Sequence, residues 1–100
     1  MTPGVFEALR DVLAATPEPP RDADPADLLT AGQAMADARE APLARLRALM
    51  SDSVELHAEC KPLLDEINDR DVRWQAALSR AGVEMTRRAA AVRRVRHRTY

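Results

Sequence analysis

The sequence has 100 residues, which allows one domain with a modest core. Hydrophobic residues make up 46% of it, so the composition is not that of a disordered chain. The single cysteine, Cys60, excludes an intrachain disulfide framework. No stretch of about 18 uncharged apolar residues suggests a membrane span, and residues 1–10 lack the features of a signal peptide. We therefore expect a cytoplasmic protein.

The formal net charge of −1 hides a strong polarity along the chain. Residues 1–70 contain 14 acids and 7 basic residues, whereas residues 71–100 contain 2 acids and 8 arginines. Such polarity can hold antiparallel helices together, complement the dipole of a helix C-terminus, or engage an acidic partner.

Good helix formers dominate the composition, and no run alternates β-branched with polar residues as a strand would. The sequence therefore predicts an all-α fold. Residues 1–15 are predicted to form a short N-terminal helix, because apolar residues recur there at helical spacing. Three prolines within residues 17–20 must end this helix. Residues 16–24 are thus predicted to be a Pro-rich linker, and docking of the first helix stays open.

Residues 25–100 are predicted to form a helical hairpin or bundle domain. Asp24 can cap its first helix, and Pro25 suits the first turn. Pro42 interrupts the apolar pattern and predicts a kink or a restart. Residues 51–53 predict a break, which could be a hairpin turn or a mild kink.

The strongest pattern starts at Cys60, from which steps of four and three residues meet twelve positions, nine of them apolar. This repeat predicts one long helix from about Ser53 to about Arg98, with a local disturbance at Pro62. Such a helix cannot bury its own apolar face. It needs the second helix, a second copy or another protein against it. The predicted architecture is an antiparallel helical hairpin or three-helix bundle with one long C-terminal helix.

Catalytic or metal chemistry finds little support in the sequence. His57 and Cys60 have a spacing that suits two metal ligands, but tetrahedral zinc needs three or four protein ligands. No Gly-rich phosphate loop or known catalytic motif is present. We therefore predict no enzyme activity, no cofactor and no metal site.

The arginine-rich C-terminal end could bind phosphates, as a basic helix does in nucleic-acid binders. No lysine-rich tail or base-reading motif accompanies it. We therefore favour a basic end that solubilises the helix and complements its C-terminal dipole, or that pairs with acids of the second helix. Trp74 lies on the apolar repeat between Ile67 and Leu78. Core packing is its ordinary role, although a Trp in an alanine-rich repeat can equally anchor an interface.

Three stretches of the chain, residues 27–50, 59–78 and 87–100, together resemble flagellar export chaperones of the FliT/FlgN kind. The first two resemble their two long helices, and the third resembles a basic C-terminus that closes with tyrosine. The linker at 16–24 and Pro42 depart from that pattern.

The resemblance implies a cytoplasmic chaperone that binds an amphipathic helical end of an exported flagellar subunit, or an export component, in an apolar helix groove. The partner-binding residues carried over from it are Trp74, Leu78, Ala81, Met85, Val92, Arg93, Arg94 and Arg96. The main alternative is a structural coiled coil that assembles from its own copies. A basic-helix nucleic-acid binder is the third hypothesis.

Overall fold

The computed structural model describes residues 4–50 and 58–99, with side chains as far as Arg94 in the second range. The described residues form α1 (Val5–Ala14), α2 (Pro25–Met50), a single 3-10 turn (Ala58–Cys60) and α3 (Lys61–Thr99). They contain no strand, so the predicted all-α class is confirmed. The molecule is elongated, with extents of 70 × 21 × 18 Å.

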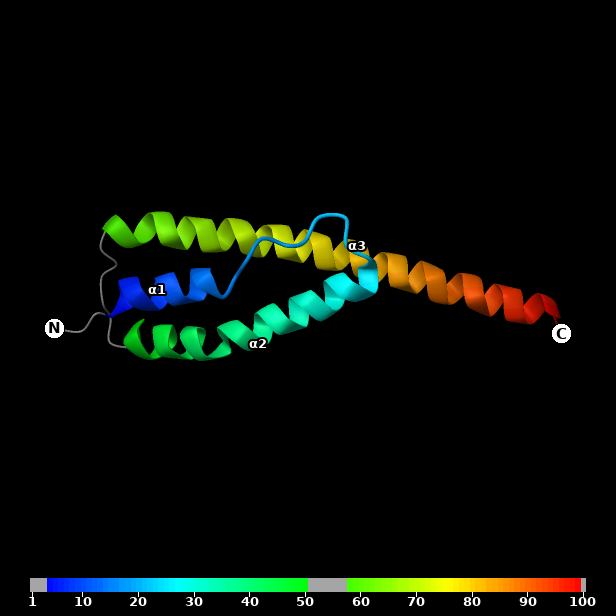
Figure 1. Cartoon of the computed structure of the whole chain (residues 1–100), viewed down its shortest axis with the longest axis horizontal. Coiled ribbons are helices and arrows are strands. Elements are labelled where there is room, and N and C mark those ends of the chain that lie inside the picture. Colours follow the sequence, from blue (N-terminus) through cyan, green and yellow to red (C-terminus); the bar gives the residue numbers. More distant parts are fainter. Residues whose placement is uncertain (1–3, 51–57, 100) are drawn as a thin grey trace.

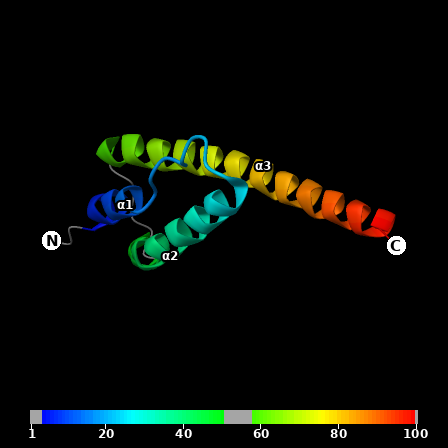
Figure 2. The same cartoon turned by 45° about the vertical axis from the view of Figure 1, so that its right-hand side comes forward.

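The helices run alternately along the long axis of the molecule (Figure 1). α1 and α3 point the same way, and α2 runs antiparallel to both. α1 contacts both longer helices, so the left half of Figure 1 is a three-helix bundle. In the turned view the C-terminal part of α3 continues well past the N-terminal start of α2 (Figure 2). The antiparallel packing makes α2 and α3 a hairpin, although residues 51–57 themselves lie outside the described range.

The first helix is docked. Its Leu9 and Val12 are each only 1% exposed, and they form a cluster with Cys60 and Ile67 of the 3-10 turn and α3. Leucines of α2 and α3 complete this cluster at its edges. Burial of such apolar side chains supplies most of the stabilisation that a short helix of 10 residues lacks on its own.

The second helix begins as the sequence predicts. The carboxylate of Asp24 accepts a hydrogen bond from the backbone N–H of Ala26 (3.2 Å), and its carbonyl accepts one from Leu28 (2.9 Å). Pro25 occupies the first position, where a missing N–H costs no hydrogen bond. Pro42 lies inside α2, which continues through it to Met50 without a restart.

A second cluster of buried residues joins α2 to α3 away from α1. Leu28 and Met35 of α2 pack there with Trp74, Ala77 and Ala81 of α3. Gly32 of α2 faces the same cluster, where a Cβ atom would lie only 2.8 Å from Cδ2 of Leu78. A glycine at this position therefore allows the two helices to approach closely.

The third helix begins later than the sequence predicts. It starts at Lys61, after the 3-10 turn, and not near Ser53, which lies outside the described residues. The prediction of a disturbance inside the helix at Pro62 is wrong, because Pro62 is the second residue of α3. Proline is tolerated in the first turn, where its missing N–H would have no partner anyway.

Three polar residues interrupt the apolar repeat of α3, and the two whose side chains are described, Asp71 and Arg88, each have an ionic partner. Arg39 of α2 donates a hydrogen bond to Asp71 at 2.5 Å. Arg88 donates to Asp24 at 3.2 Å, at the start of α2. The interruptions are thus cross-links between the helices. Among the described side chains of α3, Arg88 is the last that bonds to the rest of the chain.

Candidate partner-binding surface

The Pro-rich linker (residues 16–24) lies along α3 and is bonded to it. Thr16 is fully buried, and its carbonyl accepts a hydrogen bond from Nη1 of Arg70 at 2.9 Å. The indole N–H of Trp74 donates to the carbonyl of Pro17 at 2.6 Å. The proline-rich segment cannot form helical hydrogen bonds, so α3 side chains satisfy its carbonyls instead.

An ion pair fixes the middle of the linker. Arg73 donates from Nε and Nη2 to the two carboxylate oxygens of Glu18, at 2.7 and 2.5 Å. The hydrogen bond from Arg73, together with its positive charge, holds the pKa of Glu18 below its ordinary value. The same hydrogen bond raises the pKa of Arg73. This planar two-point contact is the strong form of the arginine–carboxylate interaction.

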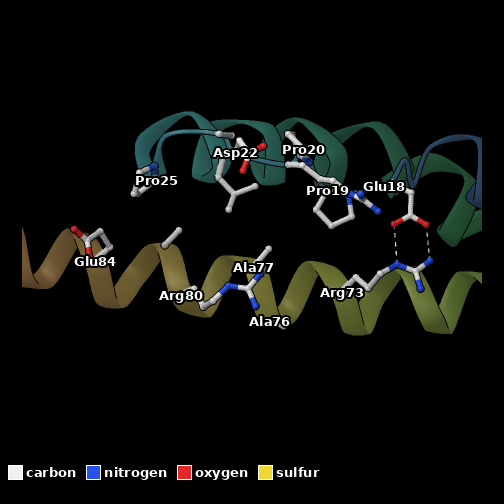
Figure 3. A pocket seen from close by; sticks show the side chains of 14 residues that line it. Glu18, Pro19, Pro20, Asp22, Pro25, Arg73, Ala76, Ala77, Arg80 and Glu84 are labelled. Atoms are coloured by element: carbon white, nitrogen blue, oxygen red, sulfur yellow. Dashed lines mark hydrogen bonds and ion pairs between the residues drawn. The ribbon is translucent and has the colours of Figure 1, made fainter.

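A groove of about 1130 Å³ runs between the linker and α3. Figure 3 shows Pro19, Pro20 and Asp22 of the linker on one side and Arg73 and Arg80 of α3 on the other. Alanines of α3 and Leu28 of α2 also line it. The Glu18–Arg73 pair closes one end of the groove, and the helix beyond its other end is the part of α3 that projects from the bundle.

The residues assigned to partner binding from the sequence fall into two groups. Trp74 is 3% exposed and Ala81 4%, and both are core residues of the chain, with Leu78 packed against them. Met85 is 38% exposed and Val92 53% exposed. The same apolar repeat is therefore covered by α2 as far as Ala81 and uncovered beyond it.

Two predicted basic residues, Arg93 and Arg94, are exposed on the projecting part of α3. Neither has an ion pair or a side-chain hydrogen bond with any residue that the structure describes. The side chain of Arg96 lies outside the described residues. The stretch from Met85 to Arg94 contains no acid, so the projecting helix carries uncompensated positive charge.

Of the residues that the sequence offered as metal ligands, the structure places Cys60. Cys60 is 2% exposed among apolar side chains and is a free thiol. Its predicted neighbour His57 lies outside the described residues. Over residues 4–50 and 58–94, no three His, Cys, Asp or Glu side chains are placed to hold a metal ion. No described helix is both long and apolar enough to cross a membrane.

The sequence reasoning missed the role of the linker. Its contacts join residues that lie 54 to 57 positions apart, and no pattern within the linker points to them. It also missed the groove, because no local pattern predicts where an extended segment lies. Comparison with protein-family models, with curated proteins and with solved structures finds no match to this chain.

Proposed function

We propose that the protein binds a partner protein through the projecting part of α3. The surface is the inner stripe, defined as Met85, Ala89 and Val92. Met85 and Val92 continue the apolar repeat of α3 where α2 no longer covers it, and Ala89 lies between them on the same face. These residues follow one another at four- and three-residue spacing and are all exposed. One observation carries this proposal. The apolar face of α3 is buried against α2 as far as Ala81, and it continues beyond that point without a cover.

Physical chemistry supports binding in preference to a free helix end. An isolated helical segment gains little from its own hydrogen bonds and is stabilised mainly when an apolar face is packed. A partner helix laid along the inner stripe would bury Met85 and Val92, and each large apolar side chain contributes about 1.5–3 kcal/mol when fully buried. The exposed Arg93 would lie at the rim of the stripe and favour an acidic partner, whereas Arg94 lies on the opposite side of the helix.

The finer proposal is a cytoplasmic chaperone for an exported flagellar subunit. Its support is the resemblance of the three stretches named above, together with a hairpin whose long helix offers an apolar stripe to a second amphipathic helix. The bound end of the subunit would be kept from pairing with its own copies. Trp74, Leu78 and Ala81 would then support the site from beneath, because they hold α2 against α3.

The test is co-purification of the tagged full chain from its native cells, with bound proteins identified by mass spectrometry. The proposal expects an exported flagellar cap or hook-associated subunit, or an export component, in near-equal amount with the chain. Recovery of the chain alone as a stable oligomer would contradict it and favour a structural coiled coil. A nucleic acid in place of a protein would contradict it as well.

A further inference from the structure

A second, unrelated pattern lies on another face of α3. From Arg73, steps of three and four residues alternate arginine with alanine or valine along almost six turns of the helix. We call this row the outer seam, and it consists of Arg73, Ala76, Arg80, Val83, Arg87, Ala90 and Arg94. Residues at such spacing share one face of a helix. Because Arg87 follows Met85 by about 200° of helical rotation, the outer seam faces away from the inner stripe.

The outer seam is open along most of its length. Val83 is 54% exposed, and Arg80, Arg87 and Arg94 are exposed as well. Within the described part of the chain, none of these three arginines has an ion pair or a side-chain hydrogen bond. Arg73 and Arg80 also line the wall of the groove, so the seam begins beside the linker and continues past it.

The chain itself shows what the first position of the seam binds. Arg73 holds the carboxylate of Glu18 through two hydrogen bonds of 2.7 and 2.5 Å. The following arginines repeat at seven-residue intervals, which on a helix is about 10.5 Å. A carboxylate presented at each interval would meet Arg80, Arg87 and Arg94 in the way that Glu18 meets Arg73.

We propose that the outer seam binds an acidic amphipathic helix of a partner protein, with an Asp or Glu at every seventh position. A helix is the element whose side chains repeat at the same interval as those of α3. Ala76 and Ala90 are small enough for a partner helix to come close, and Val83 offers an apolar contact between two arginines. The inference concerns a different face from that of the proposed function and does not depend on it.

Charge decides between this occupant and a second copy of the chain. If a second copy bound in parallel, each arginine of the seam would lie opposite the same arginine of the other copy. If it bound antiparallel, the arginines of both seams would lie in one interface. In neither arrangement does the seam of the second copy itself contain a carboxylate, and like charges at such positions are destabilising. Nucleic-acid backbones need no apolar residue between the basic ones, whereas the seam places one between every pair of arginines.

The test uses the full chain and a labelled synthetic helical peptide in which Glu and Leu alternate at three- and four-residue spacing. A scrambled peptide of the same composition is the control ligand. Binding is followed by fluorescence anisotropy in about 0.1 M salt, where contact charges still act. We expect the patterned peptide to bind more tightly than the scrambled one. The double variant R87E/R94E should lower its affinity by about tenfold or more.

The matched control protein is R10E/R47E, which changes the net charge equally at two exposed arginines that have no ion pair in the described residues. It should bind the peptide as the wild type does, and circular dichroism should show equal helix content in both variants. Equal affinity of the two double variants, or of the two peptides, would overturn the inference. Displacement of the peptide by duplex DNA, or a dimer that R87E/R94E dissolves, would also overturn it.

Failure here is distinguishable from failure of the proposed function. That function predicts that a co-purified subunit depends on Met85 and Val92, which the outer-seam variants leave intact. If the native partner still co-purifies but the acidic peptide does not bind the outer seam, this inference is refuted and the proposed function is not.

Discussion

Glu18 and Arg73, 55 residues apart in the sequence, bind each other through two hydrogen bonds of 2.7 and 2.5 Å. The pair lies one residue from Trp74, whose indole N–H donates to the carbonyl of Pro17 beside Glu18. These hydrogen bonds hold the linker against Trp74, which is the one tryptophan of the sequence. This arrangement makes the fluorescence of Trp74 a direct reporter of the linker.

The first prediction concerns acid release of the linker. Because the folded pKa of Glu18 is lowered from 4.5, its stabilising contribution is complete above the unfolded pKa and is lost as the pH falls through the lowered folded value. We expect the emission of Trp74 to shift to the red over that range, below pH 4.5. Substitution of Glu18 by Gln should produce a similar red shift already at neutral pH.

The matched control for Glu18→Gln is Glu7→Gln. Glu7 is exposed on α1 and has no ion pair with a described residue. Its substitution should leave both the neutral spectrum and the acid-induced shift of Trp74 as in the wild type. If Glu18→Gln gave the wild-type spectrum at every pH, the ion pair would not hold the linker over Trp74.

The second prediction concerns Trp74 itself. The side chain is 3% exposed in the cluster between α2 and α3, so Trp74→Ala should lower the free energy of unfolding by about 3–5 kcal/mol. Trp74→Phe keeps an aromatic ring but loses the bond to Pro17, and should cost less. Urea denaturation followed by circular dichroism measures both. A stable, fully helical Trp74→Ala protein would show that this residue is not part of the core.

The third prediction compares two glycines. Alanine favours a helix over glycine by about 0.5–1 kcal/mol, so Gly82→Ala should raise the free energy of unfolding by that amount. A Cβ at Gly82 meets nothing within 4 Å, whereas one at Gly32 lies 2.8 Å from Cδ2 of Leu78. The free energy of unfolding of Gly32→Ala should therefore be about 1 kcal/mol lower than that of Gly82→Ala. Equal gains in thermal or urea denaturation would mean that α2 and α3 are not so close at Gly32.

The fourth prediction concerns the cross-link between Arg39 and Asp71. Their side chains are 22% and 39% exposed, so water screens the pair only in part. A double-mutant cycle with Arg39→Met and Asp71→Asn should give a coupling of about 0.5–1 kcal/mol that falls as salt is added. A coupling of zero at low salt would show that the pair contributes nothing to the α2–α3 contact.

Local patterns were enough to predict the helices. The spacing of Leu9 and Val12, the cap at Asp24 and the repeat through Trp74 each depend on residues within a few turns. The repeat also predicted one long C-terminal helix, and α3 has 39 residues. The predicted start of α3 near Ser53 was wrong because the apolar spacing continues across Pro62. Such spacing does not show at which residue a helix begins.

Long-range packing was not predictable in the same way. Nothing local to Asp71 shows that Arg39 will lie opposite it, and nothing local to Glu18 points to Arg73. The sequence pattern also treats Trp74 and Val92 alike, since both lie on one repeat. Whether α2 covers a residue of the repeat depends on where α2 begins, which the contact between Asp24 and Arg88 marks. As a result Trp74 is covered and Val92 is not.

The most direct test of the proposed function compares three proteins in co-purification from native cells. These are the wild type, the inner-stripe variant M85E/V92E, and V72E, whose altered residue is 63% exposed on α3 outside both the inner stripe and the outer seam. Each should keep the helix content of the wild type, because the altered side chains are all exposed. We predict that M85E/V92E loses a partner protein that the wild type and V72E retain in near-equal amount. Retention of that partner by M85E/V92E would contradict binding through the projecting part of α3.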